Sequence, residues 1–361
     1  MSENGEGGNL PSDLERLKSF FAESLAKLDG KKKVALFSHS TPDPDAVGSM
    51  RGMQYLLGYM YGLESDCFYD GEISHPQNKA TVQLLDTHLV KVEQYEPDQY
   101  VLNILVDTIP INAGVGKHEI KFDIVIDHHK ELPNGNFNGL LIHHHTGSCC
   151  GIIYDLLREA KVPFNDEDEE TIKIASSLMI GVITDTDHCM SQDTTFRDFR
   201  AQQELFELRD ADAVRKIVRF NRPMSWVKLK GVAINEAVID QGVAVVGLGL
   251  LEYEQRDVIA DIASDMLTWS NVQTSVVFAL FGGERIEGSV RTNDDTIEIH
   301  ALCGKIAGKH GQGGGKSCKG GYKKSLGCMQ LDIDEDDALK DKMWGVVKDR
   351  EIKKIFKLIK K

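Results

Sequence analysis

The stretch FSHSTPDPDAVGS, residues 37–49, combines three potential metal ligands with a restricted backbone. His39, Asp43 and Asp45 follow an apolar run and precede a segment of helix length, so we predict a strand that turns into a helix. The two prolines restrict the turn, and Gly48 lets the helix approach a neighbour closely. The turn would therefore hold two carboxylates and an imidazole together, although Asp and Pro are also common in ordinary turns.

Similar apolar runs recur outward from this turn and indicate an α/β fold. Residues 34–37, 101–106 and 124–126 are short and apolar, and helix-length segments such as residues 46–61 separate them. This alternation is typical of a largely parallel sheet covered by helices. Residues 174–183 are also apolar, but their length favours a buried helix. Because ligands bind at the carboxyl ends of parallel strands, we expect the site at that edge.

Acidic residues and histidines end three further apolar segments. Asp107 ends the second run, Asp127-His128-His129 ends the third, and Asp185 ends the helical segment. A single Asp after a strand is usually a turn or a helix cap, but carboxylates from four segments at one edge favour metal ligation. Carboxylate and imidazole ligands without thiolate favour Mn²⁺, with Mg²⁺ or Co²⁺ as substitutes. Two such ions suit phosphate-ester hydrolysis, because together they neutralise its transition state.

The composition predicts an ordinary globular protein of the cytoplasm. No apolar stretch among the 361 residues approaches the roughly 20 needed to cross a bilayer, and the N-terminus lacks a signal-peptide pattern. Membrane contact is therefore not expected. Seven cysteines without zinc-type spacing favour reduced thiols. The net charge of -14 opposes non-specific binding to nucleic acid, so a nucleic-acid substrate should be short.

The length and the composition shifts predict two domains with a connector. The predicted segments are an N-terminal helix (1–30), an α/β catalytic domain (31–192), a helical linker (193–230), a smaller α/β substrate-binding domain (231–335) and a basic C-terminal helix (336–361). Apolar runs at 242–250, 274–281 and 287–291 predict strands in the smaller domain. The terminal helix is read as a solvated surface helix or as a contact for a partner or for nucleic acid.

These residues together resemble the DHH phosphoesterase superfamily, which is named for the motif that stands here as Asp127-His128-His129. The resemblance covers roughly residues 31–322. A smaller second domain with a glycine-rich run resembles the DHH-associated domain of oligoribonuclease/pAp-phosphatase enzymes. The resemblance implies a parallel-sheet domain joined by a helical linker to a smaller α/β domain, with the substrate bound between them.

The resemblance also implies a role for each ligand-type residue. The metal ligands would be His39 and Asp43 at one position, Asp45, His128 and Asp185 at the other, and Asp107 as a bridge. Asp127 would orient an imidazole, and His129 would contact the phosphate or stabilise the leaving oxygen. Asp127 and His129 are therefore the predicted catalytic residues.

Substrate binding in the smaller domain is predicted for Arg291 and for the glycine run. Here Gly313, Gly314 and Gly315 are followed by Lys316, where the family usually has histidine. The glycine amides would cradle a phosphate, and the lysine would add positive charge without an aromatic ring. A flexible surface loop rich in glycine and lysine is the alternative interpretation.

The expected function is that of a two-metal phosphoesterase acting on short oligonucleotides, on nucleotide phosphates such as pAp, or on both. Two alternatives keep the metal chemistry: a pyrophosphatase or exopolyphosphatase, and a cyclic-dinucleotide phosphodiesterase. A catalytically altered nucleotide-binding protein is the non-enzymatic alternative, because Lys316 replaces the usual histidine. The oligomeric state, a homodimer included, stays open.

Overall fold

The computed structural model describes residues 11–25, 33–133, 137–316, 318–327 and 337–359. The chain divides into two compact units, Met1–Asn221 and Arg222–Lys361. The division lies inside residues 193–230, for which the sequence predicts a linker. Within the described ranges, no helix is long and apolar enough to cross a membrane.

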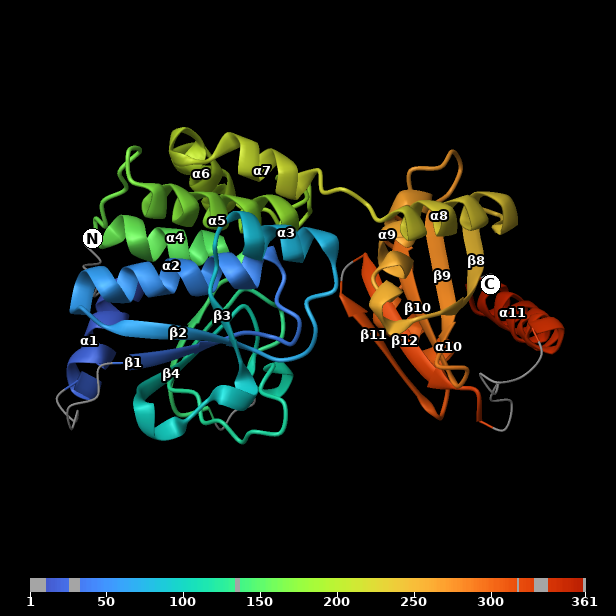
Figure 1. The fold of residues 1–361 in the computed structure, drawn as a ribbon, viewed down its shortest axis with the longest axis horizontal. Helices are drawn as coiled ribbons and strands as arrows, with labels where there is room; N and C mark the ends of the chain where they lie inside the picture. The colour runs from blue at the N-terminus through green and yellow to red at the C-terminus, as the bar shows by residue number, and fades with distance from the viewer. Residues whose placement is uncertain (1–10, 26–32, 134–136, 317, 328–336, 360–361) are drawn as a thin grey trace, which may run out of the picture. The chain divides into compact units, whose positions relative to one another are not determined.

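The first unit is built on a six-stranded sheet in which all strands are parallel (Figure 1). Its strands are β1 (Lys33–Phe37), β2 (Glu64–Tyr69), β3 (Leu89–Lys91), β4 (Tyr100–Val106), β5 (Ile124–Asp127) and β6 (Leu140–His143). Their order is β3-β2-β1-β4-β5-β6. The order therefore reverses between β1 and β4, and ligands bind at the carboxyl ends of strands at such a reversal. The predicted α/β fold class is confirmed.

Helices cover one face of this sheet, and loops with short 3₁₀ turns cover the other. The α-helices are α1 (Asp13–Leu25), α2 (Pro44–Tyr61), α3 (Pro76–Leu84), α4 (Cys149–Glu159), α5 (Glu169–Asp185), α6 (Phe196–Leu205) and α7 (Ala211–Val218). The 3₁₀ turns in those loops are η1 (Val92–Gln94), η2 (Pro97–Gln99) and η3 (Pro110–Asn112). A fourth 3₁₀ turn, η4 (Phe206–Leu208), lies among the helices, between α6 and α7 and against α5. Along β1, Val34 and Leu36 join the core beneath α2, α4 and α5, whereas Ala35 and Phe37 join a core with Tyr95. Burial on both faces explains the uninterrupted apolar runs.

The turn at residues 37–49 is set by local chemistry at the start of α2. Asp43 caps the helix, because its Oδ1 accepts the backbone N–H groups of Asp45 and Ala46 at 3.0 Å. Pro44 occupies the first helical position, where its missing N–H costs nothing. Gly62 ends the helix in the left-handed conformation. The cap and the proline therefore fix where the carboxylates of this turn lie.

Helices α2, α4 and α5 approach so closely that Gly48 has no room for a side chain. A Cβ atom there would lie 2.6 Å from both Cys150 Sγ and the Ser177 backbone oxygen. Because a backbone oxygen cannot rotate away, we expect Gly48→Ala to lower the free energy of unfolding by about 1–3 kcal/mol, the usual cost of overpacking. Urea unfolding measures this change.

Gly58→Ala, on the same helix, is the matched control for this prediction. Apart from the neighbouring backbone of its own helix, no atom of the described residues lies within 4 Å of the Cβ it would add. Alanine loses less backbone entropy than glycine in a helix, so this variant should be more stable by about 0.5–1 kcal/mol. Equal stabilities of the two variants would contradict the close packing at Gly48.

The second unit is built on a mixed sheet with the order β11-β12-β10-β9-β8-β7. Its strands are β7 (Val238–Asp240), β8 (Val243–Leu251), β9 (Thr274–Phe281), β10 (Arg285–Thr292), β11 (Gly311–Lys316) and β12 (Lys319–Ser325). Its helices are α8 (Met224–Glu236), η5 (Tyr253–Gln255), α9 (Val258–Met266), α10 (Ile299–Ala307) and α11 (Asp337–Ile359). Among the strand pairs that the structure describes in this unit, only β8–β9 is parallel. It is the smaller α/β domain that the sequence predicts.

Two segments of the second unit differ from the simplest reading of the sequence. The glycine run is not a loop but the edge strand β11, which pairs with β12. Helix α10 lies directly against it, since a Cβ atom on Gly313 would lie 2.3 Å from the Cys303 backbone oxygen. The C-terminal helix α11 is not merely a solvated surface helix, because Val347 and Ile355 are buried in the core of this unit.

Candidate functional site

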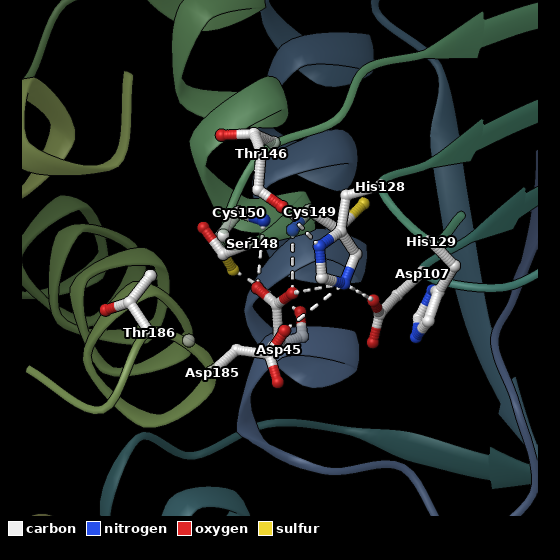
Figure 2. A network of polar contacts seen from close by, with 12 residues as sticks. Asp45, Asp107, His128, His129, Thr146, Ser148, Cys149, Cys150, Asp185 and Thr186 are labelled. Carbon is white, nitrogen blue, oxygen red and sulfur yellow. Dashed lines mark hydrogen bonds and ion pairs between the residues drawn. The ribbon is translucent and has the colours of Figure 1, made fainter. Parts of the chain in front are cut away.

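The six predicted metal ligands lie together at the carboxyl edge of the parallel sheet. Three come from the ends of strands and three from the ends of helices: His39 after β1, Asp107 after β4, His128 after β5, Asp43 and Asp45 at the start of α2, and Asp185 at the end of α5. Figure 2 shows Asp45, Asp107 and Asp185 gathered around the ring of His128. The six residues form two groups, and the ligand atoms within each group lie within 4.8 Å of one another. The groups are His39, Asp43 and Asp107, and Asp45, His128 and Asp185.

The first group centres on His39. Its Nε2 atom lies 3.5 Å from Asp107 Oδ2 and 3.7 Å from Asp43 Oδ1. Its Nδ1 atom lies 2.9 Å from the backbone oxygen of Ser40. A carbonyl oxygen only accepts hydrogen bonds, so Nδ1 carries a proton. In the neutral ring, Nε2 then directs a lone pair at the two carboxylates, an arrangement that favours a cation between them.

The second group centres on His128 and repeats this arrangement. Its Nε2 atom lies 3.2 Å from Asp185 Oδ2, 3.3 Å from Asp107 Oδ1 and 3.9 Å from Asp45 Oδ2. Its Nδ1 atom donates to the backbone oxygen of Thr146 at 2.9 Å. Nε2 is buried and has no hydrogen-bond partner among the described residues. An orphaned nitrogen among carboxylates fits a metal ligand, and Asp107 offers a separate oxygen to each group.

The electrostatics of the cluster also favour cations. Burial and the carboxylates of Asp107 and Asp185 raise the pKa of Asp45 well above its usual range, although a helix N-terminus beside it acts in the opposite direction. Burial lowers the pKa of His128, but Asp107, Asp45 and Asp185 outweigh it and raise that pKa to about 10. The metal-free cluster therefore holds protons that a bound cation would displace.

Asp107 is the residue that connects the two groups. Burial raises its pKa, but the close imidazole rings of His128 and His39 outweigh burial and lower that pKa. Burial likewise lowers the pKa of His39, but the carboxylates of Asp107 and Asp43 outweigh burial and raise that pKa well above its usual range. Asp107 also has a φ angle of 58°, in the left-handed region that residues other than glycine seldom adopt. Backbone strain of this kind is common at functional sites.

The start of α4 holds Asp45 in place, a contact that the sequence analysis missed. The backbone N–H groups of Cys149 and Cys150 donate to Asp45 Oδ2 and Oδ1 at 2.7 and 2.9 Å. A helix N-terminus favours a negative charge, so it both orients and stabilises this carboxylate. Burial raises the pKa of both thiols, which keeps them protonated and unsuited to ligate a metal.

The two predicted catalytic residues are hydrogen-bonded to each other. Nδ1 of His129 lies 2.7 Å from Asp127 Oδ1, and Asp127 is fully buried. His143 donates from its ring to the backbone oxygen of His129 and so supports the loop after β5. The side chain of His129 is 37% exposed and lies beside Asp107 and His128. The geometry thus matches the expected role of Asp127 in orienting an imidazole.

The predicted substrate-binding residues all lie in the second unit but do not line a single pocket. Gly313 and Gly314 line a cavity of about 500 Å³, whose described lining does not include Gly315. Arg291 donates to Ser289 Oγ at 2.7 Å, and burial lowers the pKa of its guanidinium. It is not among the cavity residues either. Lys316 ends strand β11, and its side chain lies outside the described residues.

Comparisons with known proteins agree with this fold. The sequence model of the DHH family, N-terminal domain, matches residues 33–182. An uncharacterized protein of Methanocaldococcus jannaschii is 27% identical over 345 residues, covering 92% of this chain and 68% of that protein. A probable manganese-dependent inorganic pyrophosphatase of Streptococcus agalactiae is 28% identical over 182 residues, covering 49% of this chain and 55% of the relative.

A solved structure supports the fold over nearly the whole chain. The crystal structure of an exopolyphosphatase-related protein from Bacteroides fragilis has a TM-score of 0.61 at 16% identity, covering 96% of this chain and 97% of that one. At this identity the likeness concerns the fold alone. The family match is more specific, because it contains the strand ends that carry His39, Asp107 and Asp127-His128-His129. Residues 33–182 are therefore a DHH family domain.

Proposed function

We propose that this protein is a two-metal phosphoesterase that hydrolyses phosphoester bonds in short oligonucleotides, in nucleotide phosphates such as pAp, or in both. The observation that carries the proposal is the pair of ligand groups around His39 and His128, which share Asp107. Each group contains a histidine nitrogen that faces carboxylates while the other ring nitrogen donates to a carbonyl. Ligands of this kind suit Mn²⁺, with Mg²⁺ or Co²⁺ as substitutes.

The chain supplies ligands for two positions and groups for proton handling. In this proposal His39 and Asp43 serve one position, Asp45, His128 and Asp185 the other, and Asp107 both. When bound, two divalent cations supply neutralisation of phosphate charge and acidification of a water molecule. Asp127 holds Nδ1 of His129 and leaves Nε2 of that ring for a phosphate oxygen or the leaving oxygen.

The cavity of the second unit supports a nucleotide-type substrate. Its lining combines the cationic Arg256 and Lys323 with the acidic Asp257 and Glu287 and the apolar Ile259, beside the glycine strand. Arg256 is ion-paired with Glu287. A pocket for bare phosphates would need dense positive charge, whereas a mixed lining suits a phosphate attached to an organic group. Substrate contacts by Arg291, by Gly313–Gly315 and by Lys316 belong to the same proposal.

Hydrolysis of inorganic pyrophosphate is the second candidate. The similarity to a probable manganese-dependent inorganic pyrophosphatase favours it, because that similarity covers 49% of this chain. The same similarity covers 55% of the relative, so it leaves much of each protein unmatched. The mixed lining of the second unit's cavity is the reason why we rank pyrophosphate below nucleotides.

A substrate panel tests the proposal. Mn²⁺-loaded protein would be incubated with short RNA, short DNA, pAp, cyclic dinucleotides, polyphosphate and pyrophosphate, and kcat/KM measured for each. We expect the highest value for an oligonucleotide or pAp. A preference for pyrophosphate would replace our proposal with the second candidate. Tight nucleotide binding without turnover of any compound would instead indicate a nucleotide-binding protein.

A further inference from the structure

We infer that Asp198, on α6, is a positioning residue for one of the two metal positions. The inference rests on the proposed function, because it concerns the ligands of that site. Asp198 lies outside residues 33–182 and is fully buried. Its hydrogen bonds among the described residues go to residues 146–148 and to Thr195 rather than to a metal ligand. It acts through the loop 146–148, which lies between β6 and α4. This loop contacts His128 and leads directly into the backbone amides that bind Asp45.

The carboxylate of Asp198 gathers this loop with hydrogen bonds to both of its oxygens. Oδ2 accepts from Thr146 Oγ1 at 2.7 Å and from the Gly147 backbone N–H at 2.9 Å. Oδ1 accepts from Ser148 Oγ at 2.8 Å. Thr195, the residue before α6, adds its backbone N–H at 2.9 Å and its hydroxyl at 2.8 Å to Oδ2. Three consecutive loop residues are therefore held by one buried charge, and charged hydrogen bonds are stronger than neutral ones.

The first consequence of this clamp is the orientation of His128. The backbone oxygen of Thr146 accepts the Nδ1 proton of His128, which fixes the tautomer and directs Nε2 at the carboxylates. Asp198 binds the side chain of the same threonine. If the clamp were lost, the carbonyl would move with the loop, and the ring would no longer be held in one orientation.

The second consequence is the position of Asp45. Ser148 caps α4, since its Oγ accepts the backbone N–H of Gly151 at 3.1 Å. The next two backbone N–H groups, of Cys149 and Cys150, hold both oxygens of Asp45. The clamp on Ser148 thus fixes where the helix begins and where those two amides point. Figure 2 shows Ser148, Cys149 and Cys150 at this helix start beside Asp45. Asp198 in this way supports two ligands of the same position.

Close packing ties this loop to the third ligand of that position. A Cβ atom on Gly147 would lie 2.5 Å from Thr186 Cγ2 and 3.1 Å from Asp198 Oδ2. Thr186 directly follows Asp185 and is fully buried. The clamp therefore borders His128, Asp45 and Asp185, whereas none of its hydrogen bonds reaches His39 or Asp43 at the other position. Losing it should affect the two positions unequally.

The test measures Mn²⁺ binding to the full chain rather than turnover. Titration followed by the electron paramagnetic resonance of free Mn²⁺ gives a dissociation constant for each position. In Asp198→Asn the amide nitrogen can only donate, so it cannot accept the bonds that one carboxylate oxygen accepts. We expect one dissociation constant to rise about 10–100-fold, the usual cost of losing a residue that orients a metal ligand, while the other stays within about threefold.

Asp155→Asn is the matched control. Asp155 lies on α4 and pairs with Arg197 at 2.8 Å and Arg200 at 2.6 Å on α6, so it joins the same two helices without touching the loop. It should lower stability toward urea but leave both dissociation constants unchanged. Thr146→Val is the second variant if Asp198→Asn does not fold. It removes the hydroxyl that contacts Asp198 and Thr195 and keeps the carbonyl. It should weaken the same position only, by a smaller factor.

The outcomes separate the inference from the proposed function. Unchanged dissociation constants in folded Asp198→Asn would overturn the positioning role. If that variant does not fold, unchanged dissociation constants in Thr146→Val would overturn it. In either case, two ions bound to the wild-type protein would still support the proposed function. Equal weakening at both positions, or the same change in Asp155→Asn, would show a general loss of structure and also overturn it. A wild-type chain that binds no Mn²⁺ would refute the proposed function itself, and the positioning role with it.

Discussion

Asp107→Ala is expected to abolish turnover and to weaken Mn²⁺ binding at both positions. Its two oxygens lie 3.3 Å from His128 Nε2 and 3.5 Å from His39 Nε2, so one carboxylate serves both ligand groups. Loss of an orienting partner alone costs about 10–100-fold in metal affinity, and loss of a shared ligand should cost at least the upper end of that range at each position. Metal content after gel filtration, together with kcat on the best substrate of the panel, measures the effect.

Asp123→Ala is the control for this prediction. Asp123 is half-buried just before β5, at the opposite end of that strand from the DHH motif, and its carboxylate accepts the backbone N–H of Asn103 at 2.9 Å. This variant should lose some stability and keep both ions. If Asp107→Ala retained two ions per chain and a near-normal rate, Asp107 would not be the shared ligand.

Removing the metal with a chelator is expected to abolish turnover and leave the chain folded. The ligands lie at one edge of the sheet, whereas the apolar core beneath α2, α4 and α5 contains none of them. Protons also compensate for the missing cations in part, since the raised pKa of His128, about 10, keeps its ring charged at neutral pH. Circular dichroism and turnover would be followed in parallel as chelator is added. The turnover rate should fall while the circular dichroism signal stays constant.

Recovery with Mn²⁺ completes this experiment. Because the fold persists, adding Mn²⁺ should restore the original rate without a refolding step. A loss of the circular dichroism signal at the same chelator concentration as the loss of turnover would contradict the prediction, because it would mean that the ions are structural.

Much of the site could be predicted because its ligands follow regular elements. His39, Asp107 and His128 come directly after buried parallel strands, and all such strands end at the same edge of the sheet. Side chains close in sequence to those ends are therefore brought together once the strands pair. Asp45 could be predicted for a similar reason, because it lies in the first turn of a capped helix that begins at the same edge.

The residues that hold these ligands could not be predicted in this way. The amides of Cys149 and Cys150 reach Asp45 from more than a hundred positions along the chain, and Asp198 reaches the loop 146–148 from another helix. Ser148 caps α4, but nothing in the local sequence shows which carboxylate a helix N-terminus faces. Backbone amides have no side-chain signature, so their partners appear only when the helices pack.

The glycine run shows the same limit in the second unit. Gly313–Gly315 was compatible with a phosphate cradle or a loop, because glycine permits either conformation. The structure makes it an edge strand against α10, where the absence of Cβ atoms allows the helix to approach. Whether a glycine is needed for backbone freedom or for close packing depends on its neighbours in space.

By itself, then, the sequence determined the parallel α/β fold class and the residues able to bind metal, because periodic burial and strand-end chemistry are local properties. Tertiary structure alone decided that Asp107 offers one oxygen to each histidine, that carbonyl oxygens set both tautomers, and that the amides of α4 hold Asp45 while Asp198 holds the loop beside His128. The physical reason is that these contacts are made between segments distant in sequence, and hydrogen-bond geometry is defined only after packing has set the distances.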